Sequence, residues 1–210
     1  MEQVPRQTTR TSRSSGYAIG VDPGKEGAAV VLLGRSAVAA ACWKQVKRQR
    51  KSVFEFKLAT PEQLVSVEYL PRASAVGQSL CQFLRAFSIG ESLLACEDIF
   101  FSKNVRSAVS LARTAGEVVG VLENHLDTKS EWVMAGEWRY DILGLARNTK
   151  REIAKAASLK LLPARVKLLD QILDRVGKLD HVTDAAGVAA WVQAQETSRN
   201  NEHVYNSRVF

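Results

Sequence analysis

Three short, apolar segments rich in β-forming residues follow one another near the start of the chain. Helical and extended patterns alternate after them. The segments cover Tyr17–Val21, Ala28–Leu33 and Ala37–Trp43, with Gly34-Arg35-Ser36 as a turn between the second and third. This order limits the chain to an α/β domain with a mixed sheet and helices on its faces.

The rest of the chain supplies further elements of the same kinds. Helical spacing appears in Ala75–Phe87 and Asn104–His125, and a helix start is expected at Thr60-Pro61-Glu62. We expect the remaining strands at Ser92–Cys96 and Trp132–Met134, which makes five in all. Short helices are expected from Trp138 to Arg175 and a final one over His181–Gln195.

The two ends of the chain lack this periodicity. Residues 1–16 predict a disordered basic tail and residues 197–210 a polar C-terminal tail, so residues 17–196 form the expected domain. The three cysteines, Cys42, Cys81 and Cys96, are isolated among apolar residues and predict reduced core thiols in a cytosolic protein. With no signal core or membrane span in sight, we expect a cytoplasmic protein without membrane contacts.

Acidic residues stand where strands are predicted to end. Asp22 follows an apolar strand and precedes Pro23-Gly24, and Glu97 ends the apolar run that begins at Ser92. Asp22 alone also suits an Asp that starts a turn, and Glu97 alone suits a salt bridge at the edge of a sheet. A carboxylate at a buried strand end is nevertheless costly unless it is paired or bound to a metal ion.

A third acidic group opens the final predicted helix. Asp180 and Asp184 are four residues apart and His181 and Asp184 three apart, so they share one helical face. Asp180 also suits an N-cap, whereas the small apolar residues after Asp184 indicate that this part of the helix is buried. Together with the strand-end acids, these residues predict a site for hard divalent cations, magnesium or manganese, with two ions positioned for phosphodiester chemistry.

These same segments resemble the RuvC family of Holliday-junction resolvases. The resemblance is carried by Ile19–Gly24, by Glu97-Asp98-Ile99-Phe100-Phe101-Ser102-Lys103-Asn104 with the helix that follows, and by His181-Val182-Thr183-Asp184-Ala185-Ala186. It implies a ribonuclease H-like fold, a homodimer with two active sites, and paired nicks across a four-way DNA junction in recombination and repair. It further implies a bacterial or phage-infected cell, with the protein associated with the nucleoid.

The resemblance also assigns roles to single residues. Asp22, Glu97, His181 and Asp184 would be the catalytic metal ligands. Many relatives have Asp at the position of His181, so Asp180 is an alternative third ligand. Phe100 would lie against unstacked bases, with burial in the core as its alternative, and Lys103 would contact a phosphate near the site.

Basic residues predict where a polyanion would bind. The net charge is +7, from 29 Lys and Arg against 22 Asp and Glu. We expect Lys47 and Arg48, in a charged linker over Lys44–Lys51, to contact DNA. A second basic set is expected on one helical face and comprises Arg147, Lys150, Arg151 and Lys155. A solvated surface is the alternative for both sets.

Three functional interpretations remain open on the sequence alone. The first is the junction-resolving endonuclease, with flaps or forks as alternative branched substrates. The second is an actin-like ATPase or sugar kinase, which also begins with an Asp-x-Gly turn but needs further glycine motifs that this sequence lacks. The third is a DNA-binding protein that kept the fold and lost catalysis.

Overall fold

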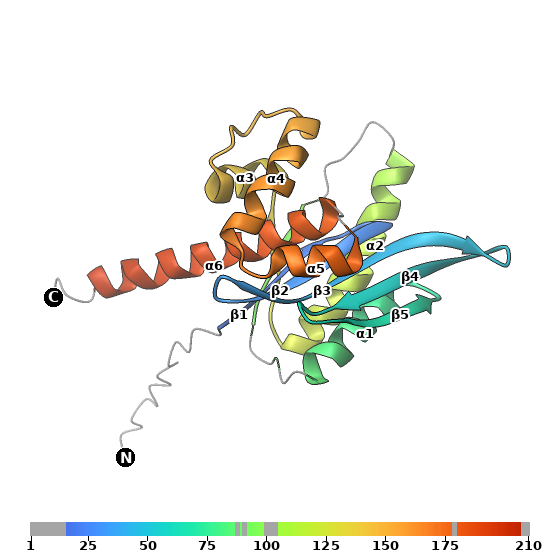
Figure 1. Cartoon of the computed structure of the whole chain (residues 1–210). Helices are drawn as coiled ribbons and strands as arrows, with labels where there is room; N and C mark the ends of the chain where they lie inside the picture. Colours follow the sequence, from blue (N-terminus) through green and yellow to red (C-terminus); the bar gives the residue numbers. More distant parts are fainter. Residues whose placement is uncertain (1–15, 87–88, 90–91, 99–104, 178–179, 207–210) are drawn as a thin grey trace, which may run out of the picture.

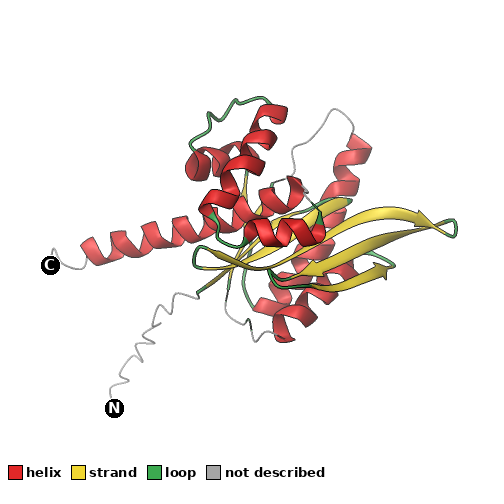
Figure 2. Cartoon of the chain, in the orientation of Figure 1, coloured by secondary structure: helices red, strands yellow, loops and turns green. Residues whose placement is uncertain are grey.

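The structure, a computed structural model, describes residues 16–86, 89, 92–98, 105–177 and 180–206. Its centre is one sheet, drawn in yellow in Figure 2. The strand order of this sheet is β5-β4-β3-β2-β1-β6-β7. The strands are β1 (Tyr17–Asp22), β2 (Glu26–Leu33), β3 (Ser36–Arg48), β4 (Lys51–Ala59), β5 (Leu64–Leu70), β6 (Leu93–Glu97) and β7 (Glu131–Val133).

The directions of the strands define the fold. Strands β1 to β5 form an antiparallel meander, whereas β6 runs parallel to β1 and β7 runs parallel to β6. The parallel steps are made through the helices α1 (Ala73–Ala86) and α2 (Val105–Leu126). This arrangement confirms the predicted mixed α/β sheet flanked by helices, although seven strands replace the five that were expected.

The two additional strands correct the prediction for residues 44–70. The charged stretch predicted as a linker is a hairpin between β3 and β4, and its turn residues Gln49 and Arg50 both have positive φ, at 48° and 66°. Two such residues make a turn whose twist matches that of the flanking strands. The expected helix start at residues 60–62 is instead a turn into β5, closed by the Thr60 amide, which donates to the Gln63 carbonyl at 2.9 Å.

Helices cover both faces of the sheet (Figure 1). On one face α1 and α2 pack against alternate side chains such as Ile19 and Val21 of β1 and Phe56 of β4. On the other face lie α5 (Leu169–Val176) and α6 (Asp180–Asn206), with α3 (Ala135–Leu143) and α4 (Arg151–Arg165) packed on α6. Because successive side chains of β1 point to opposite faces of the sheet, they lie in two separate apolar cores.

Helix α6 lies unusually close to β1 because of Gly20. A Cβ atom on Gly20 would stand 2.1 Å from the Ala185 carbonyl oxygen and 2.3 Å from the Ala189 amide nitrogen. Real side chains cannot approach backbone atoms so closely, so this position requires glycine. The contact fixes the height of α6 above the strand that ends in Asp22.

The sequence predicted the end of α6 too early. The helix was expected to end at Gln195 and continues to Asn206. Beyond Gln195 it is held by Arg199, which makes two hydrogen bonds of 2.7 and 2.8 Å to Glu131 at the start of β7. A local apolar pattern carries no sign of that long-range ion pair.

Cys42, Cys81 and Cys96 are buried free thiols, as predicted. Within the described part of the chain, no helix combines the length and the apolar character needed to cross a bilayer.

Candidate active site

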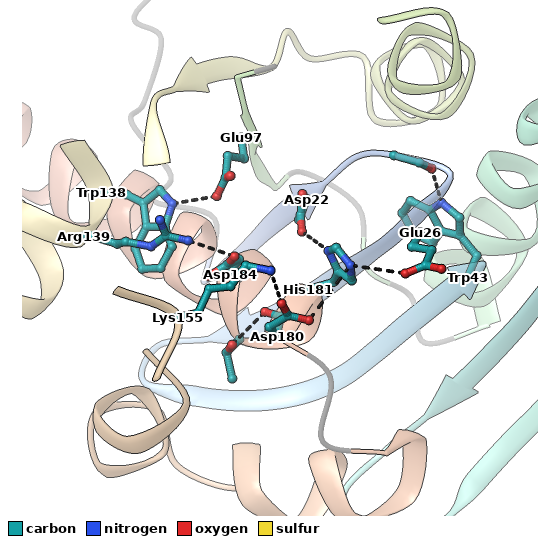
Figure 3. Close-up of polar contacts among 12 residues, drawn as sticks. Asp22, Glu26, Trp43, Glu97, Trp138, Arg139, Lys155, Asp180, His181 and Asp184 are labelled. Atoms are coloured by element: carbon teal, nitrogen blue, oxygen red, sulfur yellow. Dashed lines mark hydrogen bonds and ion pairs between the residues drawn. The ribbon is translucent and has the colours of Figure 1, made fainter. Parts of the chain in front are cut away.

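The predicted site lies where β1 and β6 end side by side. Val21 pairs with Cys96 in parallel register, so Asp22 and Glu97 follow at the same edge of the sheet. Helix α6 begins above this edge and brings His181 and Asp184 over the strand ends (Figure 3). The structure therefore gathers all four predicted metal ligands in one region.

Asp22 and His181 are in direct contact. The His181 Nδ1 atom lies 2.6 Å from Asp22 Oδ2, and its Nε2 atom lies 3.9 Å from Glu26 Oε2 and 4.0 Å from Asp180 Oδ1. The hydrogen bond with Asp22 raises the pKa of His181, burial works against this, and the charges of Asp22 and Asp180 add to it. The imidazole is thus surrounded by carboxylates that favour its cationic form.

Glu97 is held by an indole. Trp138 Nε1 donates to Glu97 Oε2 at 2.9 Å (Figure 3). The pKa of Glu97 is raised to about 8, first by burial and then by the nearby charges of Asp22 and Asp184, against the opposing effects of Trp138 and Arg139. Near neutral pH and without a cation, the glutamate therefore tends to keep its proton.

Asp184 is paired inside the protein with Arg139 of α3. Arg139 Nη2 donates to Asp184 Oδ2 at 2.9 Å, with side chains only 10% and 6% exposed. The guanidinium also lies 4.9 Å from the centre of the Trp138 ring. Burial raises the pKa of Asp184 to about 6, although Arg139 opposes this, and the charge of Asp22 contributes in the same direction as burial.

This pair leaves two buried atoms without partners. Asp184 Oδ1 and Arg139 Nε make no hydrogen bond within the described structure. A buried carboxylate oxygen without a donor costs free energy, and an added cation would remove that cost.

Asp180 forms an ion pair rather than joining the other acids. Lys155 of α4 contacts its carboxylate (Figure 3). Burial opposes ionisation of Asp180, but the hydrogen bond from Lys155 and the charges of His181 and Lys155 outweigh burial and lower its pKa. Lys155, which the sequence placed on a DNA-binding helical face, forms this ion pair with an acid beside the site.

Four residues at the site escaped the sequence analysis. Neither packing nor binding was predicted for Trp138 and Arg139, and no role was predicted for Glu26 or Trp43. Trp43 Nε1 donates to the Gly24 carbonyl at 3.0 Å and so fixes the turn after Asp22. No local pattern indicates that a Trp and an Arg on a distant helix reach the site. For Glu26 a signal was present, because it stands only four positions after Asp22.

The predicted DNA-binding residues lie in several places. Lys47 and Arg48 are exposed on the β3–β4 hairpin. Arg147 lies in the loop before α4 with its guanidinium 5.2 Å from the Tyr140 ring centre, and Lys150 directly precedes Arg151, the first residue of α4. The expected single helical face over residues 147–155 is therefore wrong, because the helix begins only at residue 151. Phe100 and Lys103 lie outside the described residues.

The donor set fits a hard divalent cation in its chemistry. Asp22, Glu97 and Asp184 offer carboxylate oxygens, burial and their mutual repulsion raise two carboxyl pKa values, and one buried oxygen has no partner. Among the described residues, no group of three or more His, Cys, Asp or Glu side chains lies close enough to hold an ion, and each of the three carboxylates contacts a protein partner.

Two solved structures resemble this chain. One is Thermus thermophilus RuvC in complex with a Holliday junction substrate, at 14% identity and a TM-score of 0.49, with 86% of this chain and 96% of that chain covered. The other is Thermus thermophilus RuvC, at 12% identity and a TM-score of 0.44, with coverages of 83% and 91%. The chain matches no protein-family model and no curated protein sequence. The likeness to both structures is one of overall fold, at low sequence identity.

Proposed function

We propose that this protein is a divalent-metal-dependent endonuclease that cuts branched DNA, with the four-way junction as its substrate. The observation that carries the proposal is the meeting of Asp22, Glu97, His181 and Asp184 at one edge of the sheet, with raised carboxyl pKa values. Such a group of acids repels itself unless a cation or a proton neutralises it.

Asp22, Glu97, Asp184 and His181 would hold two magnesium or manganese ions. Bound there, the ions would supply the positive charge that activates water and stabilises the leaving oxygen of a phosphodiester. A neutral histidine in place of a carboxylate, the form that binds a metal, lowers the negative charge of the site by one and favours manganese.

The protein's own residues set the position of each ligand. The Asp22 contact at 2.6 Å orients the His181 ring, and the indole of Trp138 fixes one oxygen of Glu97. Arg139 fixes Oδ2 of Asp184 and leaves Oδ1 unpaired in the buried site. Groups that orient metal ligands from behind in this way commonly decide metal affinity.

The net charge of +7 supports a polyanionic substrate. Paired nicks across a junction require two sites, so we propose a homodimer, acting on DNA in the cytoplasm at the nucleoid. Flaps and forks are the alternative branched substrates for the same chemistry.

One observation favours a second function, a DNA-binding protein without catalysis. Trp138 and Arg139 already give two of the carboxylates a partner within the protein, so these acids do not depend on an ion to be paired. In a nuclease, both contacts must coexist with a bound cation or give way to it.

The test is an incubation of the protein with a synthetic four-way junction, a flap and a linear duplex of equal length. Each substrate is incubated with magnesium, manganese or EDTA, and the products are resolved on denaturing gels. Paired nicks that need metal and prefer the junction support the proposal. Cutting of the flap alone would make the flap, and not the four-way junction, the substrate. Tight junction binding without cutting in either metal supports the non-catalytic alternative.

A further inference from the structure

One face of the three-stranded part of the sheet formed by β3, β4 and β5 carries cations beside exposed apolar side chains. We call this the hairpin face. It consists of nine side chains of these strands that point to the α5 and α6 side of the sheet and are not buried. Cross-strand register assigns to it Lys44, Val46, Arg48, Lys51, Val53, Glu55, Lys57, Val67 and Tyr69.

The charge of this face is strongly positive. Lys44 and Lys57 lie on either side of Glu55, each with its Nζ atom 3.6 Å from a carboxylate oxygen. Glu55 is the acid among the nine residues of the face, so the four cations leave three positive charges in excess. Such a density of charge attracts phosphate groups more strongly than scattered surface lysines do.

Arg48 is held in place by an aromatic ring. Its guanidinium lies 4.1 Å from the centre of the Tyr69 ring, and Tyr69 is 48% exposed. Stacking limits the rotamers of Arg48, so a phosphate contact would cost less side-chain entropy than with a free arginine.

The hairpin face is continuous with the candidate active site. Glu26 pairs with Lys44, Lys44 pairs with Glu55, and Glu55 pairs with Tyr69, which makes one row across four strands. With neighbouring strands about 4.8 Å apart, the row spans roughly 15 Å. It begins at Glu26, whose carboxylate is 3.9 Å from His181.

We propose that the hairpin face binds the phosphate backbone of the duplex DNA arm that leaves the cleavage site. This inference rests on the proposed function for the identity of the ligand. It separates two residues that the sequence treated alike: Arg48 lies on the hairpin face, whereas Lys47, paired with Ser52, points to the opposite face. Arg48 therefore contacts DNA and Lys47 does not.

Adjacent residues with equal charge and opposite orientation provide a matched test. Arg48→Gln and Lys47→Gln each remove one charge from an exposed position of the same strand. Binding of a labelled four-way junction and of a 30-base-pair duplex is measured by fluorescence anisotropy in EDTA over a range of salt concentrations. Arg48→Gln should reduce the slope of log K against log salt by about 0.9, and Lys47→Gln should leave it unchanged.

A second measurement needs no substitution. Acetylation of lysines in the wild-type protein, with and without junction DNA, should show Lys44 and Lys57 protected by DNA and Lys47 still modified. Equal slopes for the two variants, or equal protection of the three lysines, would overturn the proposal. A third outcome would also overturn it: the protein does not bind the duplex but binds poly-glutamate through Arg48. The hairpin face would then bind an acidic peptide rather than DNA.

Failure of this inference is distinguishable from failure of the proposed function. If the wild-type protein cuts junctions with metal but the two variants behave alike, only the role of the hairpin face is wrong. If the wild-type protein binds DNA with the expected difference between variants but never cuts, the hairpin face stands and the nuclease assignment falls. A wild-type protein that binds no DNA overturns both.

Discussion

Arg139 donates a hydrogen bond of 2.9 Å to Asp184, and both side chains are buried beside the strand ends. The guanidinium supplies, from inside the protein, positive charge at a place where three carboxylates repel one another. Its presence explains how Asp184 can be buried among like charges, and it makes Arg139 a residue whose removal has a defined cost.

Arg139→Met should destabilise the metal-free protein by about 3–5 kcal/mol, because it leaves a buried carboxylate without its partner. Urea unfolding in EDTA at pH 7 measures this. The double variant Arg139→Met with Asp184→Leu removes both charges and should recover much of the loss. A cost for the single variant below about 1 kcal/mol would show that the pair does not hold Asp184 in the folded protein.

The stability of the metal-free protein should fall as pH rises from 5 to 8. The pKa of Glu97 rises from 4.5 to about 8 on folding and that of Asp184 from 3.8 to about 6, so the folded state holds more protons than the unfolded state in this range. The raised pKa of His181 acts in the same direction, because the stability that its cation gives is lost as pH rises past the folded value.

Thermal unfolding in EDTA across that range measures the slope. Glu97→Gln carries no titrating group at this position and should flatten most of it. Magnesium binds the ionised acids, so it should stabilise the wild-type protein more at pH 8 than at pH 6. A metal-free protein whose stability rises over this interval would show that the acids are not buried together.

Asp22→Asn and Glu97→Gln should each abolish metal-dependent cutting while junction binding persists. Both substitutions keep the side-chain shape and remove the charge that would hold a cation. Asp170→Asn, an exposed acid on α5, is the control for the same chemical change and should cut at the wild-type rate. Normal cutting by either site variant would mean that the catalytic centre lies elsewhere.

The sequence predicted the two strand-end acids because each signal is local. An apolar strand followed by Asp22 and the Pro-Gly turn, or by Glu97, shows where the strand ends, and parallel pairing then brings the ends together. The i, i+3 spacing of His181 and Asp184 likewise needs only the helix itself. These short-range patterns were sufficient to anticipate the mixed sheet and the acids at its edge.

The surroundings of these acids depend on contacts that local patterns do not encode. Arg139 is 45 residues from Asp184 and Trp138 is 41 residues from Glu97, and nothing near them in sequence indicates burial of an arginine. The β3–β4 hairpin was missed for a different reason. Its charged residues interrupt the apolar pattern, because this part of the sheet extends beyond the apolar cores and its ladder is held by backbone hydrogen bonds.

His181→Asp should keep metal-dependent cutting and shift the preferred ion from manganese toward magnesium, because an oxygen ligand replaces a nitrogen one. Initial cutting rates over matched concentrations of the two ions measure the preference. His181→Ala, which provides no ligand, serves as the control and should lose activity in both metals. A His181→Asp protein that folds but does not cut would show that the imidazole has a role that a carboxylate cannot fill.

Gly20→Ala should destabilise the protein by about 1–3 kcal/mol, because the new methyl group would push α6 away from β1. The added Cβ atom meets backbone atoms of Ala185 and Ala189 that no side-chain rotation can move. Urea unfolding measures the loss. Gly120→Ala on α2, where a Cβ atom meets nothing within 4 Å, is the control and should stabilise the helix by about 0.5–1 kcal/mol. Because the same helix carries His181 and Asp184, Gly20→Ala should also slow cutting under conditions where the protein stays folded. An unchanged unfolding midpoint for Gly20→Ala would show that α6 does not pack against β1 at this distance. The positions of His181 and Asp184 relative to Asp22 would then be wrong.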